Sequence, residues 1–244
     1  MPKIQISSRT EDNGKNNEDS YFVGRSGDKT VVLVCDGVGG TDAGEIASGY
    51  VTKNLGVWLK DHDLSKMSVR TLHQEITLFI ENMHEDLCTI AEERGMSLGT
   101  TFVLAVIGKN KAVIENVGDS RAYICQRGYL KQITLDQTVR MYELVTGEIM
   151  DKVDDKKKDT TLMQCIGDGP KIPDPARYVT RIDEDVDILL CSDGLSNRLN
   201  ELNFQSKLKN ITVTGDTALE ELFALAMKRG EKDNITAVLY RRRK

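Results

Sequence analysis

The chain has 244 residues, 39% of them hydrophobic and 29% charged, and a formal net charge of −5 at pH 7. We expect one globular domain over residues 1–244, because no linker divides the chain and its length supports a sizeable core. The acidic balance argues against a nucleic-acid scaffold, which would carry a basic face. No apolar run approaches the roughly 20 residues that span a bilayer, and residues 1–5 lack the apolar stretch expected of a signal peptide. Five cysteines without a Cys-x-x-Cys pair favour a reducing cytoplasm over disulfides or a zinc site.

The first half of the chain predicts a buried strand followed by two helices. Residues 31–35 form an apolar run that ends at Asp36. Asp42, followed three residues later by a glutamate, is typical of a capping box and predicts a helix start. Apolar residues recur at helical spacing from Val69 to Ile90, and Gly95 suits the end of that second helix.

The middle of the chain is rich in predicted strands. Short apolar runs occupy residues 101–107, 112–117, 122–125 and 130–133, with turn residues between them. Such spacing predicts antiparallel hairpins. Residues 138–175 contain a charged run and a Gly/Pro cluster, and we interpret them as a mobile flap or surface insertion.

The end of the chain predicts one more helix and a closing strand. Thr217 and Glu220 mark the expected helix start, Gly230 its end, and an apolar strand follows Asp233. Adjacent hairpins and separate long helices indicate an α+β protein with antiparallel sheets.

Three aspartates stand where apolar strands stop. Asp36 and Asp193 each follow an apolar run and precede a glycine. Asp233 stands before an apolar run, separated from it by Asn234. Carboxylates held at rigid strand ends suit a hard divalent cation such as Mg²⁺ or Mn²⁺. Each pair alone is better explained as a turn, since Asp-Gly and Asp-Asn are common turn sequences, and only the set of three favours a cation site.

Two further acidic motifs accompany these aspartates. Glu18 and Asp19 lie at a strand entrance, where they could order metal-bound waters or belong to a solvated loop. Asp119 and Arg121 lie in a predicted hairpin and could form a salt bridge within the turn.

Taken in order, these motifs resemble the metal-dependent serine/threonine protein phosphatase family, type 2C, in its compact bacterial form. The resemblance covers nearly the whole chain. It rests on the segments 17–19, 36–48, 99–101, 116–121, 134–136, 162–167, 192–195 and 232–236.

The resemblance implies a four-layer α-β-β-α sandwich of two antiparallel sheets flanked by helices. It also implies that two Mn²⁺ or Mg²⁺ ions are bound, with Asp36 bridging them and the Gly37 carbonyl on one of them. Asp193 and Asp233 would hold the other ion. As for the remaining acids, the resemblance implies that Glu18 and Asp19 act mainly through waters and that Asp119 binds a weaker third ion.

The chain departs from the family pattern at two site positions. Gly14 stands where relatives usually carry a phosphate-binding arginine, so Lys15 and Arg9 are the candidate phosphate-binding residues. A lysine is a point charge without the bidentate fork of an arginine. Asn197 replaces an aspartate that helps the third metal in relatives. The three histidines fall in or beside helices, and we give them no catalytic role.

The expected function is hydrolysis of phosphoserine and phosphothreonine in proteins by a water that two metal ions activate. The resemblance implies phosphorylated proteins as partners, among them a Ser/Thr kinase or its substrates. We expect a cytoplasmic monomer that binds no nucleic acid and spans no membrane. The alternative is a weakly active or inactive module that binds phosphoproteins, which the changes at Gly14 and Asn197 motivate.

Overall fold

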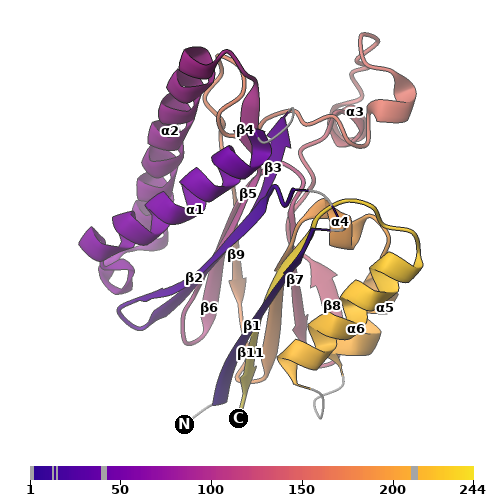
Figure 1. The fold of residues 1–244 in the computed structure, drawn as a ribbon. Coiled ribbons are helices and arrows are strands. Elements are labelled where there is room, and N and C mark those ends of the chain that lie inside the picture. The colour runs from indigo at the N-terminus through magenta and orange to yellow at the C-terminus, as the bar shows by residue number, and fades with distance from the viewer. Residues whose placement is uncertain (1–2, 13, 15, 40–42, 210–213) are drawn as a thin grey trace.

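The computed structural model describes residues 3–12, 14, 16–39, 43–209 and 214–244. Two β-sheets pack face to face, and helices cover the outer side of each (Figure 1). The layers therefore follow the order helix, sheet, sheet, helix. This arrangement confirms the predicted four-layer α+β sandwich.

The first sheet has five strands in the order β1-β11-β10-β7-β8, and every neighbouring pair is antiparallel. Helices α5 and α6 pack on its outer face through a core that includes Phe204 and Phe223. The bounds are β1 (Lys3–Glu11), β7 (Arg121–Gln126), β8 (Tyr129–Gln132), β10 (Val186–Cys191), β11 (Ile235–Arg243), α4 (Asp193–Ser196), α5 (Glu201–Leu208) and α6 (Gly215–Lys228).

The second sheet has the strand order β2-β3-β5-β6-β9, with β4 paired to the end of β3. Its outer face carries the two long helices α1 and α2 (Figure 1). The bounds are β2 (Asp19–Ser26), β3 (Lys29–Gly39), β4 (Leu98–Thr100), β5 (Phe102–Ile107), β6 (Lys111–Val117), β9 (Ala176–Arg181), α1 (Ala43–Asp61) and α2 (Val69–Arg94).

The central strands are apolar on both faces because both faces are covered. In β3, Leu33 points to the helices, whereas Val32 and Val34 belong to the core between the two sheets. Successive side chains of a strand point to opposite faces, so a strand buried on both sides gives a continuous apolar run. That explains why the run before Asp36 could be recognised in the sequence.

The segment 138–175 lies beside the sandwich and carries only short elements, α3 (Val139–Thr146) and the 3₁₀ turn η2 (Asp155–Lys157). Another 3₁₀ turn, η1 (Leu64–Lys66), joins α1 to α2. Most side chains of α3 are exposed or half-buried, which agrees with a surface segment. The sequence did not predict its helix.

The helix ends match the expectations in part. Gly95 ends α2 in the left-handed conformation, at φ 63°, as predicted. The predicted start of the last helix at Thr217 is wrong, because the Thr214 side chain accepts a hydrogen bond from the Thr217 N–H and the helix starts at Gly215. The predicted cap at Asp42 lies outside the described residues. In the described part of the chain, no helix is long and apolar enough to cross a bilayer.

Candidate metal centre

Four of the predicted metal-binding aspartates lie at one end of the sandwich. Asp36 is near the end of β3, and Asp119 lies in the turn between β6 and β7. Asp193 follows β10 and begins α4, and Asp233 directly precedes β11. In antiparallel sheets the end of one strand lies beside the start of its neighbour, so these positions share an edge.

The carboxylates at this edge are close enough to raise one another's pKa values. The pKa of Asp36 lies well above its usual value, first because of burial and then because of charge repulsion. The repelling groups are Asp19, Asp193, Asp119 and Asp233. Poorly solvated like charges that face each other are unfavourable, and a bound cation removes that cost.

Asp19 is the acid most directly coupled to Asp36. The two residues are register partners in β2 and β3. Burial raises the pKa of Asp19 to about 7, although the Ser192 hydroxyl donates to its Oδ2 at 2.8 Å. Its Oδ1 is buried and accepts no hydrogen bond. A buried acceptor without a donor suits a cation or an ordered water.

The backbone around Asp36 is held on both sides. The Asp36 N–H donates to Thr101 Oγ1 at 2.9 Å, and its carbonyl accepts from the Thr101 N–H at 2.8 Å. The Thr100 hydroxyl donates to the same carbonyl at 3.0 Å. These contacts fix the position from which the carboxylate projects.

Gly37 occupies a place that only glycine can fill. A Cβ there would lie 2.2 Å from the Gly44 carbonyl oxygen in α1 and 2.5 Å from the Glu18 carbonyl oxygen. The Gly37 N–H donates to that Glu18 carbonyl at 3.1 Å. The backbones of β3, α1 and the start of β2 therefore approach one another closely at Gly37. Because Asp36 and Gly37 lie inside β3, the pair does not form a turn.

Asp193 and Asp233 adjoin each other across the first sheet. Repulsion from Asp233 is the second cause, after burial, of the raised pKa of Asp193. The Asn197 amide donates to Asp193 Oδ2 at 3.0 Å and lowers that pKa. Gly194 lets α4 approach β11, since a Cβ there would lie 2.0 Å from the Asn234 carbonyl oxygen.

Asp119 is close to a separate ion pair. Burial, followed by repulsion from Asp193 and Asp136, raises the pKa of Asp119 to about 7. Arg121 does not form the salt bridge within the turn that the sequence left open as an alternative. Its guanidinium binds Asp136 with both Nε, at 2.8 Å, and Nη2, at 2.5 Å.

Glu18 approaches the same edge from the start of β2. Its N–H donates to Asn234 Oδ1 at 3.0 Å, and its carbonyl accepts from the Ser48 hydroxyl at 2.6 Å. Its carboxylate reaches Gly44, where a Cβ would lie 2.7 Å from Glu18 Oε1. Glu18 thereby joins β2, α1 and the loop before β11.

The predicted phosphate-binding residues are not both placed. Lys15 lies outside the described residues. Arg9 is in β1 on the side of α6, where it binds Glu11 at 2.6 Å and stacks over Phe223 at 5.5 Å. This placement gives no support to a role of Arg9 at the carboxylates.

The three histidines have other contacts. His62 stacks on Trp58, and His73 contacts Glu115 at 2.9 Å. His84 Nδ1 accepts a hydrogen bond from the Gly167 N–H at 3.0 Å.

The residues present have the chemistry of a hard-cation site, with carboxylate and carbonyl oxygens as donors. As they stand, no group of three or more His, Cys, Asp or Glu side chains among the described residues could hold a metal ion. The orphaned Asp19 Oδ1 and the mutual repulsion around Asp36 nevertheless favour a cation at this edge. Side-chain movement toward the ion would be part of binding.

Sequence reasoning missed two supporting side chains. Ser192 donates to Asp19, and Asn234 binds both the Glu18 N–H and, through its amide, the Asp12 carbonyl. Each directly adjoins a strand-end aspartate, and that adjacency was the only signal available.

A sandwich of two antiparallel sheets with acidic side chains gathered at one edge defines the class of protein. The chain matches the family model "Protein phosphatase 2C" over residues 8–232. It is 31% identical over 232 residues to the serine/threonine phosphatase stp of Listeria innocua, covering 93% of this chain and 90% of that protein. The chain belongs to the protein phosphatase 2C family.

Solved structures agree with this assignment. The serine/threonine phosphatase of S. agalactiae superposes with a TM-score of 0.88 at 25% identity, covering 98% of this chain and 99% of that one. The catalytic domain of PstP in complex with two manganese ions has a TM-score of 0.80 at 24% identity, covering 100% of both chains. At that identity the PstP likeness shows the fold alone.

The family and the relatives establish the activity as that of a protein serine/threonine phosphatase. None of these relatives supports the alternative of an inactive module that binds phosphoproteins.

Proposed function

We propose that residues 1–244 form one catalytic domain whose acidic edge binds two divalent cations, Mn²⁺ or Mg²⁺. Asp36 would contact both ions, the Gly37 carbonyl one of them, and Asp193 and Asp233 the other. The observation that carries this proposal is the repulsion that Asp36 receives from four neighbouring aspartates. The PstP catalytic domain, which shares this fold, is named as a complex with two manganese ions, and the proposal adopts that number.

When bound, the cations would supply positive charge for the phosphoryl oxygens and lower the pKa of a water that attacks phosphorus. The side chains of this chain would hold and orient the reacting groups. Asp19 would accept a proton or a water hydrogen through its open Oδ1, while Ser192 holds its other oxygen. Glu18, whose carboxylate lies beside Gly44, would orient a second water.

We propose that Asp119 adds a weaker third cation site. Its partner position, Asn197, is a neutral amide already donating to Asp193. A neutral amide attracts a divalent cation less than a carboxylate does. Occupancy of the third site should therefore need a higher metal concentration than the first two.

We also propose that Lys15 is the main cation for the substrate phosphate, since Gly14 cannot serve. Arg9 is the weaker candidate, because it would first have to leave Glu11. The substrates would be phosphorylated proteins, including a Ser/Thr kinase or its targets. The protein would be a monomer, and a reducing cytoplasm fits the five free cysteines, of which four are buried.

The test is phosphate release from a phosphothreonine peptide with Mn²⁺. Replacing a direct ligand, as in Asp36→Asn, should lower kcat by more than about 100-fold, the upper range for loss of an outer-shell group. Asp61→Asn, at the exposed end of α1, is the matched control and should keep wild-type turnover. Full turnover by Asp36→Asn would refute the assignment of the metal ligands.

A further inference from the structure

A pocket of about 250 Å³ lies far from the acidic edge, between the start of β3, η1, the start of α2 and the turn that joins β5 to β6. Strand β3 links the two places, because Lys29 lines the pocket and Asp36 belongs to the acidic edge. Seven residues of extended strand span about 23 Å. A ligand in this pocket would not touch the reacting groups.

The charged side chains that line this pocket are all lysines: Lys29, Lys109 and Lys111. We call it the lysine pocket. In a protein with a net charge of −5, three cations around one hollow without a lining carboxylate are a local reversal of sign. Such a hollow attracts anions.

Lys29 is held in place. Its side chain is only 27% exposed, and a Cβ on Gly108 would lie 3.1 Å from its Nζ, so the lysine lies against the β5–β6 turn. Its ion-pair partner, Asp28, is 64% exposed and 3.1 Å away. Exposed pairs contribute little, so Asp28 leaves most of the Lys29 charge available.

Lys109 and Lys111 are exposed, and no carboxylate among the described residues pairs with either of them. They flank Asn110 in the turn between β5 and β6, and all three residues line the pocket. Both charges are therefore free to meet a ligand.

The floor of the lysine pocket is apolar. Its lining includes Leu64, Leu72, Val106 and Val113, each at most 5% exposed, together with the half-buried Met67. Cations at the rim and hydrocarbon at the floor match a ligand that carries an anionic head and a short apolar tail.

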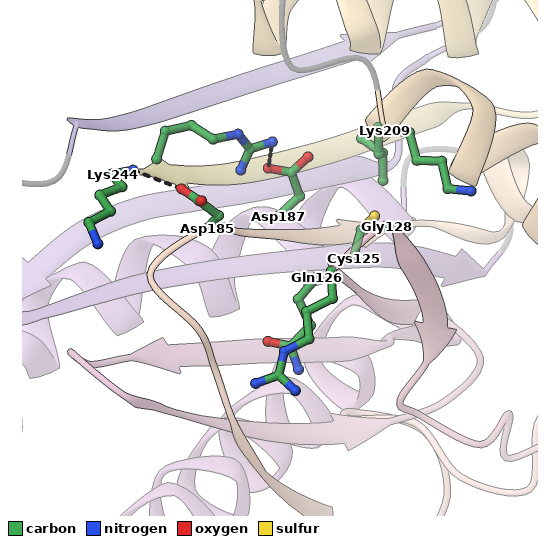
Figure 2. A pocket seen from close by; sticks show the side chains of 10 residues that line it. Cys125, Gln126, Gly128, Asp185, Asp187, Lys209 and Lys244 are labelled. Atoms are coloured by element: carbon green, nitrogen blue, oxygen red, sulfur yellow. Dashed lines mark hydrogen bonds and ion pairs between the residues drawn. The ribbon is translucent and has the colours of Figure 1, made fainter.

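A larger pocket shows the opposite arrangement (Figure 2). It measures about 480 Å³, and three of its four basic side chains, those of Arg127, Arg243 and Lys244, already have acidic partners. Buried Asp187 binds Arg241 at 2.8 Å and Arg243 at 2.7 Å, and Arg127 binds Asp183 at 2.6 Å. Most of its basic side chains are therefore matched within the protein, whereas in the lysine pocket only Lys29 has an acidic partner, the exposed Asp28.

We propose that the lysine pocket binds small anionic amphiphiles, molecules with a sulfate, phosphate or carboxylate head and a short apolar tail. The head lies among Lys29, Lys109 and Lys111, and the tail covers Leu72 and Val113. The site is separate from the metal centre and does not depend on the phosphatase mechanism.

Octyl sulfate is the probe, since a phosphatase does not hydrolyse it as a phosphomonoester. Titration of the Mg²⁺-loaded protein, followed by backbone amide NMR, should shift the signals of residues 67–70 and 108–111. Inorganic sulfate and octyl glucoside, which carry only the head charge or only the tail, should each bind at least about tenfold more weakly. Higher salt should weaken octyl sulfate binding.

The variant Lys109→Glu with Lys111→Glu should weaken octyl sulfate binding at least about tenfold. The matched control, Lys53→Glu with Lys60→Glu, makes the same charge change on exposed positions of α1 and should bind as wild type does. Equal loss in both variants, or shifts spread evenly over the surface, would overturn the site. Octyl glucoside binding as tightly as octyl sulfate would overturn the role of the lysines, and sulfate doing so would overturn the role of the apolar floor.

Discussion

Glu115 gives a prediction about stability that can be worked out from its surroundings. It lies in β6, its side chain is fully buried, and its Oε1 has no hydrogen-bond partner. Burial raises its pKa from 4.5 to about 8, and Arg177 on the neighbouring strand β9 offsets part of that effect. His73 in α2 contacts its Oε2, and burial lowers the pKa of that histidine.

The sign follows from proton binding. Between pH 4.5 and about 8 the folded chain keeps the Glu115 proton and the unfolded chain releases it. Unfolding therefore becomes easier as pH rises, by about 1.4 kcal/mol per pH unit for one group. From pH 5.0 to 7.5, Glu115 alone should lower the free energy of unfolding by about 3 kcal/mol.

The substitution Glu115→Gln removes this titration and keeps the shape of the protonated acid. Urea unfolding, followed by the fluorescence of the single tryptophan, Trp58, gives the free energy of unfolding of both proteins at pH 5.0 and 7.5. Relative to wild type, the variant should gain about 3 kcal/mol between the two pH values. Glu93→Gln, at an exposed position of α2, should gain nothing. An equal difference at both pH values for Glu115→Gln would refute the reasoning.

Two further predictions concern backbone positions. Gly37→Ala should lower the free energy of unfolding by about 3 kcal/mol or more, because its Cβ would overlap the Gly44 carbonyl oxygen. Gly49→Ala, where a Cβ meets nothing closer than 3.9 Å, should instead raise the free energy of unfolding by about 0.5–1 kcal/mol. If urea unfolding showed Gly37→Ala to be the more stable variant, the close backbone approach at Gly37 would be contradicted. Thr214→Ala should lower the free energy of unfolding by about 1 kcal/mol, because α6 loses its N-terminal cap. A larger loss in Thr217→Ala would contradict the assignment of Thr214 as the capping residue.

Elements with a strong apolar period were predictable from the sequence, and those without one were not. The runs that became β3, β5 and β10 are buried on both faces, and α2 has a continuous apolar stripe. Strand β1 is an edge strand with polar residues such as Ser7 and Ser8, so its sequence lacks an apolar run. It is a strand because nine of its residues pair with β11. Such pairing depends on residues far away in the sequence.

The same limit applies to the metal centre. The strand-end position of Asp36 was visible in the sequence, because an apolar run leads to it. That Asp19 lies opposite Asp36 depends on the register of β2 and β3, which local sequence does not specify. The hydrogen bond from Ser192 to Asp19 joins residues 173 positions apart and could only be found in the structure.

Metal stoichiometry tests the central claim most directly. Titration calorimetry with Mn²⁺ should give two tight sites per wild-type chain and none of wild-type affinity in Asp36→Asn, whereas Asp119→Asn should keep both. The metal-free Asp36→Asn protein should be at least as stable as wild type, since it loses repulsion from four neighbouring aspartates. Two unchanged tight sites in Asp36→Asn would contradict the account.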